Sequence, residues 1–157
     1  MINRIFITWF GCGYVPLAPG TMGSIGALPL CYWMMGFDAF WQKLLFAFVF
    51  MIFACITAGV DQKTATTKDP SYVVIDEVSG MLFACLWLPK SLTALCAAFV
   101  LFRLFDITKP FPGNTLDRAS KSAPLAKDRG TFIVLDDVVA GLYAGVGLYF
   151  LLVFLSL

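Results

Sequence analysis

The chain has 157 residues, the length of a single domain, and 60% of them are hydrophobic while only 13% are charged. A soluble domain usually carries about a quarter charged residues, so this composition indicates an integral membrane protein whose surroundings are the lipid bilayer. The net charge of +1 offers no basic surface, and we find no base-reading motif, which excludes nucleic acid as a partner. We therefore treat residues 1–157 as one membrane-embedded domain.

The chain contains no histidine, which removes the commonest general base and every Ser-His or Cys-His dyad. Any chemistry must then depend on carboxylates, lysine, arginine, hydroxyl groups or a hard metal ion. The five cysteines are scattered singly and lack the spacing of a metal site or of a disulfide framework. We interpret them as packing residues.

Residues 11–26 are rich in glycine and proline, which is typical of a loop. Such a loop can direct backbone N–H groups, among them that of Gly20, towards an anionic substrate. The hydroxyls of Thr21 and Ser24 would add further donors. The same residues are also typical of a turn followed by an ordinary helix cap, and the sequence leaves both interpretations open.

Several apolar segments follow this glycine-rich stretch. Residues 41–60 are numerous enough to cross the hydrocarbon core as a helix. We expect further crossings over 72–88, 92–105 and 138–157, and a short segment over 25–35 that either crosses or re-enters. The pattern predicts an all-α membrane bundle of about four or five transmembrane or re-entrant helices.

Basic residues are distributed unequally between the two sides of this bundle. The polar segments 61–71 and 106–137 carry seven Lys and Arg residues, whereas the opposite side has only Lys43 and Lys90. The positive-inside rule therefore places these polar segments in the cytoplasm. We expect four polar motifs to meet at that face: the glycine-rich stretch, Asp69 with Asp76-Glu77, residues 103–109, and Asp136-Asp137.

Five carboxylates border the predicted crossings. Either pair, Asp76-Glu77 or Asp136-Asp137, could by itself be a helix-terminal pair stabilised by the helix dipole. With Asp106 at the same depth, the five would repel one another unless a cation joined them. A site made of oxygen ligands suits Mg²⁺, which usually also binds a phosphate. We therefore expect Asp76, Glu77, Asp106, Asp136 and Asp137 to be metal ligands and catalytic residues.

Arg103, Asp106 and Lys109 recur at intervals of three residues, so one helical face carries alternating charges. Pro110 and Pro112 are expected to end this helix. We expect Arg103 and Lys109 to bind a phosphate, the first with two parallel hydrogen bonds and the second as a point charge. A snorkelling arginine with a surface ion pair is the alternative.

Two further features lie in the C-terminal third. Arg118, within the polar segment 106–137, is a candidate for contacting a lipid headgroup, although a solvated side chain near anionic lipid is the alternative. The pattern Ala140-Gly141-x-x-Ala144-Gly145 predicts a face of small residues, along which the last helix packs closely on a neighbour. That packing would press Asp136-Asp137 towards the other carboxylates.

Four motifs follow one another along nearly the whole chain: Gly13-Tyr14-x-Pro16-x-Ala18-Pro19-Gly20-Thr21-x-Gly23-Ser24, Val74-x-Asp76-Glu77-x-x-Gly80-Met81, Phe102-Arg103-x-Phe105-Asp106-x-x-Lys109-Pro110-x-Pro112 and Asp136-Asp137-x-x-Ala140-Gly141. Together they resemble the phosphatidylglycerophosphatase A family. The resemblance implies a multi-pass enzyme of the bacterial inner membrane with its active site on the cytoplasmic side. It further implies an Mg²⁺-dependent phosphatase that removes the terminal phosphate of phosphatidylglycerophosphate to give phosphatidylglycerol. Residues 129–135 depart from the family's usual pattern, which is richer in glycine there.

Two other functions fit part of the pattern. A transporter or proton relay would also place carboxylates within a membrane, but we find no inverted repeat to support it. A non-catalytic scaffold would leave the converging carboxylates unexplained. For a phosphatase, attack by a water molecule and formation of an aspartyl phosphate both remain open. The sequence indicates neither the number of metal ions nor the oligomeric state.

Overall fold

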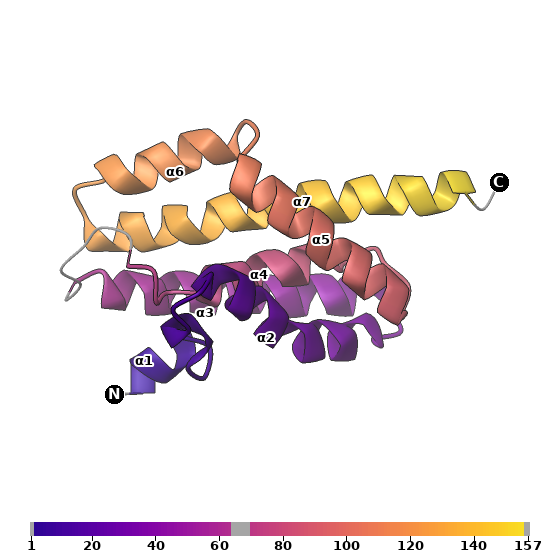
Figure 1. Cartoon of the computed structure of the whole chain (residues 1–157), viewed down its shortest axis with the longest axis horizontal. Helices are drawn as coiled ribbons and strands as arrows, with labels where there is room; N and C mark the ends of the chain where they lie inside the picture. The colour runs from indigo at the N-terminus through magenta and orange to yellow at the C-terminus, as the bar shows by residue number, and fades with distance from the viewer. Residues whose placement is uncertain (1, 64–69, 156–157) are drawn as a thin grey trace.

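The computed structural model describes residues 2–63 and 70–155, which form α-helices, one short 3₁₀-helix and no β-strand (Figure 1). The elements are α1 (Ile2–Ile7), η1 (Cys12–Tyr14), α2 (Pro19–Met35), α3 (Phe40–Asp61), α4 (Ile75–Ala84), α5 (Leu92–Thr108), α6 (Gly113–Ser122) and α7 (Ala126–Leu155). This architecture confirms the all-α prediction. Asp69, which the sequence grouped with Asp76-Glu77, lies outside the described residues.

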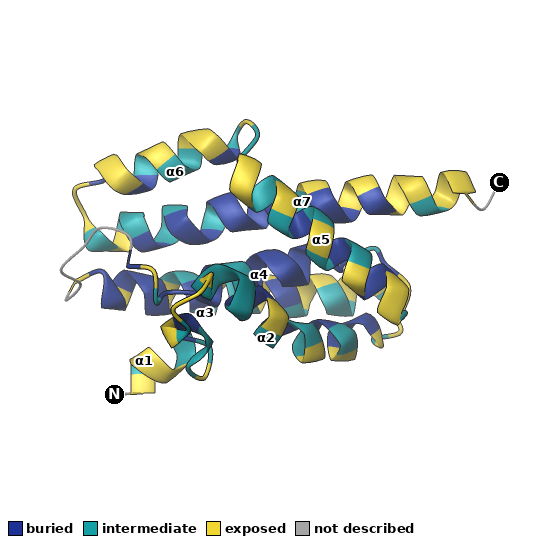
Figure 2. Cartoon of the chain, viewed as in Figure 1, coloured by how far each residue is buried: buried dark blue, intermediate teal, exposed yellow. Residues whose placement is uncertain are grey.

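The short helix α4 lies at the centre of the bundle, where α2, α3, α5 and α7 pack against it (Figure 1). Every residue of α4 except Glu77 is buried (Figure 2). The helix has 10 residues and is therefore about 15 Å long, half the thickness of a hydrocarbon core. The longer helix expected over residues 72–88 is thus replaced by a short core helix, with Asp76 and Glu77 in its first turn.

Helices α4 and α7 approach each other so closely that only glycine fits between them. A Cβ atom on Gly141 would lie 2.1 Å from the carbonyl oxygen of Gly80, and one on Gly145 would lie 2.7 Å from that of Ala84. The predicted small-residue face is therefore confirmed. On the other side of the contact, a Cβ on Gly80 would lie 2.6 Å from the carbonyl oxygen of Asp137.

The polar segment 106–137 is largely helical rather than a loop. It contains α6 and the first turns of α7, which begins at Ala126 instead of Val138. The cause is a buried stripe, because Gly130, Ile133 and Val134 are buried against the bundle, whereas the charged residues 127–129 just before them are not. Asp136-Asp137 consequently lies well inside α7, where a favourable helix-terminal dipole cannot explain it.

The glycine-rich stretch is also more regular than predicted. Helix α2 begins at Pro19, whose fixed φ and missing N–H suit the first helical position. Only the part before Pro19 is irregular, so the loop interpretation is wrong for residues 19–26. Gly23 serves close packing instead, since a Cβ there would lie 2.6 Å from the Cβ of Val74.

Two described helices, α3 and α7, are long and apolar enough to cross a membrane, and they suggest a membrane protein. Their polar ends lie together, because a Cβ on Gly130 near the start of α7 would lie 2.3 Å from the backbone nitrogen of Gly59 near the end of α3. The last turns of α7 extend beyond the other helices and expose Phe150, Phe154 and Leu155 (Figure 2). Helices α2 and α5 have 17 residues each, so among the described residues two helices meet this criterion and the predicted count of four or five crossings is not confirmed.

We expect the substitution Gly141→Ala to lower the free energy of unfolding by about 1–3 kcal/mol, because the new methyl group forces α4 and α7 apart. Thermal unfolding of the detergent-solubilised protein measures this loss. The matched control is Gly147→Ala on the same helix, where an added Cβ meets nothing within 4 Å. Equal melting temperatures for the two variants would contradict the proposed tight contact.

Candidate active site

A polar cleft of about 350 Å³ opens where the first turns of α2 and α4 meet the C-terminal part of α5, the helix α6 and the first half of α7. It is lined by charged side chains from four helices and from the residue that follows α5. They are Asp76, Glu77, Arg103, Lys109, Asp117, Asp136 and Asp137. The backbone of Pro19-Gly20, at the start of α2, forms another part of the wall. The cleft therefore combines both signs of charge in a largely apolar protein.

Three of the carboxylates form a cluster that we call the triad: Asp76, Glu77 and Asp137. One oxygen from each lies within 4.8 Å of those of the other two. Glu77 Oε2 and Asp137 Oδ2 are buried and have no hydrogen-bond partner among the described residues. Buried carboxylates at this separation repel each other strongly, and a bound cation would relieve that repulsion. The donor set is that of a hard divalent ion.

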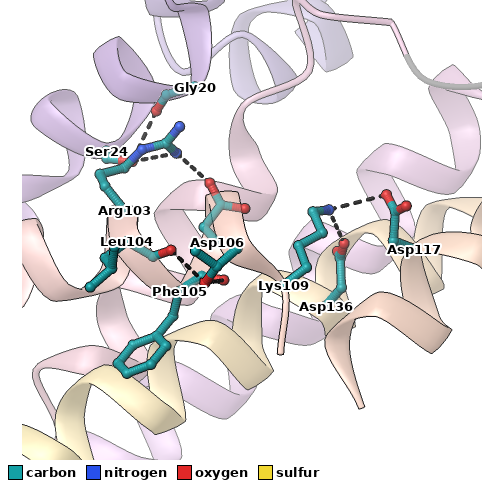
Figure 3. Close-up of polar contacts among 10 residues, drawn as sticks. Gly20, Ser24, Arg103, Leu104, Phe105, Asp106, Lys109, Asp117 and Asp136 are labelled. Carbon is teal, nitrogen blue, oxygen red and sulfur yellow. Dashed lines mark hydrogen bonds and ion pairs between the residues drawn. The ribbon is translucent and has the colours of Figure 1, made fainter. Parts of the chain in front are cut away.

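Arg103 is held at the wall of the cleft by two side chains (Figure 3). Its guanidinium Nη1 lies 2.7 Å from Asp106 Oδ2 and donates a hydrogen bond of 3.4 Å to Ser24 Oγ. Ser24 Oγ in turn donates to the carbonyl oxygen of Gly20 at 2.9 Å. Ser24 is buried, so its hydroxyl orients the arginine instead of meeting solvent.

Lys109 is the second cation of the cleft. It follows α5 with a left-handed φ of 42°, and its ammonium group lies between Asp117 and Asp136 (Figure 3). Its hydrogen bond to Asp117 Oδ1 is 3.1 Å long, and Lys121 donates to the other oxygen of the same carboxylate at 2.7 Å. Burial raises the pKa of Asp117, but hydrogen bonds from Lys121 and Lys109 outweigh it and hold that pKa below its ordinary value.

Asp117 was not among the predicted site residues. The available signal was its position four residues before Lys121, a spacing at which a carboxylate and an ammonium group meet on one helical face. Recognising that spacing required α6 to be predicted as a helix. Because Asp117 shares Lys109 with Asp136, it links the otherwise peripheral α6 to the cleft.

Four of the five predicted carboxylates line the cleft, and Asp106 lies beside it in contact with Arg103; the five fall into two groups. Asp76, Glu77 and Asp137 form the triad, whereas Asp106 and Asp136 are paired with Arg103 and Lys109 respectively. The structure therefore separates three oxygen donors from two carboxylates that orient the cations.

The remaining predicted substrate-binding residues differ in position. Gly20 lines the cleft, and a Cβ added there would lie 2.2 Å from Glu77 Oε1. Thr21 is half-buried in the next position of α2 and does not line the cleft. Arg118 is exposed on α6 and likewise lies outside the lining.

Comparison with known sequences identifies the family to which the chain belongs. The pattern described as "Phosphatidylglycerophosphatase A" matches residues 5–152, which is almost the entire chain. The chain belongs to the phosphatidylglycerophosphatase A family. It is therefore a phosphatase that hydrolyses phosphate monoesters, and its family supports action on lipids.

Relatives in three bacteria extend this assignment. Phosphatidylglycerophosphatase A of Escherichia coli K12 is 36% identical over 146 residues, 90% of this chain and 78% of the relative. A Bacteroides thetaiotaomicron protein, provisionally named a phosphatidylinositol-3-phosphatase, is 33% identical over 87% of this chain and 85% of its own length. Phosphatidylglycerophosphatase A of Haemophilus influenzae is 31% identical over 86% and 79%. No solved structure matches the chain.

We expect Gly20→Ala to reduce kcat by more than tenfold while leaving the melting temperature nearly unchanged. The added methyl group displaces the flexible end of Glu77 from the triad, which disturbs the site more than the fold. Phosphate release and thermal unfolding are measured on the same preparation. Gly147→Ala serves as the control, and a Gly20→Ala variant with the activity of that control would contradict this role for Gly20.

Proposed function

We propose that this protein removes the terminal phosphate of phosphatidylglycerophosphate and releases phosphatidylglycerol, with Mg²⁺ as its cofactor. The single observation that carries the proposal is the cleft that places the carboxylate triad beside Arg103 and Lys109. A phosphate monoester needs cations around its oxygens, and a divalent ion needs carboxylates. The E. coli relative and the H. influenzae relative, both named phosphatidylglycerophosphatase A, support this choice of substrate.

Asp76, Glu77 and Asp137 would hold the metal ion. The buried oxygens of Glu77 and Asp137 that lack partners among the described residues support this assignment, as does the absence of any nitrogen or sulfur donor in the triad. Mg²⁺ favours such a site when substrate phosphate oxygens and water complete its ligands. When bound, the ion would neutralise phosphate charge and polarise the phosphorus–oxygen bonds.

The two cations of the cleft would bind the phosphate from the other side. The Arg103 guanidinium would contact two phosphate oxygens, and the Lys109 ammonium group a third. In the absence of substrate, Asp106 and Asp136 hold these cations in place, so their side chains need little rearrangement when phosphate arrives. The N–H of Gly20, in the first turn of α2, would add a hydrogen bond.

Hydrolysis in this arrangement would proceed by attack of water on phosphorus. The water oxygen forms a bond to phosphorus, the bond to the glycerol oxygen breaks, and that oxygen receives a proton. A carboxylate of the cleft would accept the proton that water loses. The second route, in which a carboxylate attacks and forms an aspartyl phosphate that water then hydrolyses, uses the same residues.

The reaction would take place at the cytoplasmic face of the bacterial inner membrane. In support, the end of the bundle that carries Lys63, Lys127 and Arg129 is also the end at which the polar parts of α3 and α7 meet. The positive-inside rule assigns such an end to the cytoplasm.

Removing divalent metal should abolish phosphate release and should also lower thermal stability. We expect wild-type protein treated with a chelator to lose more than 99% of its activity, and added Mg²⁺ to restore it. Mg²⁺ should raise the melting temperature of the wild type but not that of Asp76→Asn, because the variant lacks one ligand. Activity that survives chelation would contradict the metal assignment.

The control for this experiment is Asp38→Asn, which removes an exposed carboxylate that does not line the cleft. It should keep both the activity and the Mg²⁺-dependent rise in melting temperature. If Asp76→Asn behaves like this control in both assays, Asp76 is not a metal ligand.

The Bacteroides relative raises phosphatidylinositol 3-phosphate as a second substrate. We expect kcat/KM to be at least tenfold higher for phosphatidylglycerophosphate. The terminal phosphate of phosphatidylglycerophosphate is attached to a slender glycerol chain, which can reach the buried triad. The phosphate of phosphatidylinositol 3-phosphate is attached to a ring and flanked by two ring hydroxyls, which hinder its approach. Phosphate release from matched vesicles of the two lipids measures the ratio. A ratio below one would reassign the substrate.

A further inference from the structure

A second hollow lies beside the cleft, on the surface of α7. It has a volume of about 340 Å³ and is lined by Pro112, Val139, Leu142, Tyr143 and Val146. We call it the apolar groove. The four lining residues of α7 recur at intervals of three and four, so they form one stripe along the helix. The stripe is half-buried near Val139 and exposed at Val146, which makes the groove open to the surroundings at its far end.

The apolar groove begins where the charged cleft ends. On α7, Asp136 lines the cleft and Val139, one turn later, lines the groove. In the segment after α5, Lys109 lines the cleft and Pro112 lines the groove. Two separate segments of the chain thus pass from one hollow to the other within three residues. The hollows are therefore neighbours, one charged and one apolar.

The Tyr143 hydroxyl is the one polar side-chain group among the residues that line the groove, and it is hydrogen-bonded elsewhere. Tyr143 Oη donates a hydrogen bond of 2.8 Å to the carbonyl oxygen of Phe111, next to Pro112. The Tyr143 ring also packs against Phe105, with the ring centres 5.8 Å apart. Tyr143 therefore presents its ring to the groove and joins α7 to the segment that carries Lys109.

We propose that the apolar groove binds one acyl chain of the phospholipid whose phosphate enters the cleft. This inference rests on the proposed lipid phosphatase function and adds a site for the hydrophobic part of the substrate. A molecule with a phosphate at one end and a hydrocarbon chain at the other matches the order of the two hollows. The chain would follow α7 from Val139 to Val146, about 10 Å along the helix axis.

The groove would act on orientation more than on affinity. A hydrocarbon chain that leaves a lipid phase for an apolar protein surface gains little, because lipid tails are as apolar as leucine. A chain fixed against α7 nevertheless restricts the glycerol backbone and so aims the phosphate at the triad. Misplacement of a reacting group by about 1 Å can cost roughly a hundredfold in rate.

The test compares two substrates with one headgroup: dioleoyl phosphatidylglycerophosphate and its deacylated form, glycerophosphoglycerophosphate. The wild type should show a higher kcat/KM for the dioleoyl substrate. In Val146→Trp, whose indole fills the open end of the groove, the ratio of the two kcat/KM values should fall at least tenfold. The matched control is Val49→Trp, an exposed valine on α3 outside the groove, which should leave the ratio unchanged.

A second measurement does not depend on turnover. Phosphatidylglycerophosphate with a diazirine in the half of one acyl chain nearer the glycerol is photoactivated on the wild type in Mg²⁺-free detergent, and the labelled residues are mapped by mass spectrometry. Labelling concentrated on residues 139–146, and reduced in Val146→Trp, supports the groove. Labelling spread equally over α3 and α7, or an equal fall in the substrate ratio for Val49→Trp and Val146→Trp, overturns it. Failure of the wild type to release phosphate from either substrate refutes the proposed function instead, and the labelling pattern then decides the groove alone.

Discussion

The close approach of α4 and α7 is the contact on which the rest of the structure depends. Because Gly80 and Gly141 have no side chains, the two helices meet backbone to backbone, and this contact brings their carboxylates together. Packing of the surrounding apolar residues must offset the repulsion within the triad. The fold thus holds three carboxyl groups in a position that favours a cation.

The cations of the cleft are arranged by the opposite principle. Arg103 and Lys109 each rest against a carboxylate outside the triad, and those carboxylates are themselves fixed on α5 and α7. A charged side chain that is already desolvated and oriented needs less reorganisation to bind a phosphate than one that is free in water. In the proposed mechanism, Asp106, Asp136 and Asp117 would tune the phosphate-binding groups, while the triad would supply the oxygens for the metal ion.

Most of the charged residues that line the cleft could be singled out from the sequence, because residue type and local context are enough to identify them. Carboxylates bordering apolar segments, in a chain without histidine, are costly, and that cost indicates a use. Spacing of three residues placed Arg103 and Asp106 on one face, and the ion pair between them confirms it. The local sequence pattern did not indicate that α6 and the start of α7 are helical, because their few buried residues are interspersed with many charged and polar ones. Asp117 was missed for that reason.

The sequence by itself determined the all-helical class, the family, and the set of charged residues available for chemistry, because these depend on composition, periodicity and motif. Only the tertiary structure decided how those charges are divided. Asp136 and Asp137 are adjacent in sequence, but their side chains leave the helix about 100° apart. The orientation of α7 about its axis therefore decides that Asp137 joins Glu77 while Asp136 pairs with Lys109. That rotation is set by the glycine contact between α4 and α7, which acts between residues about sixty positions apart.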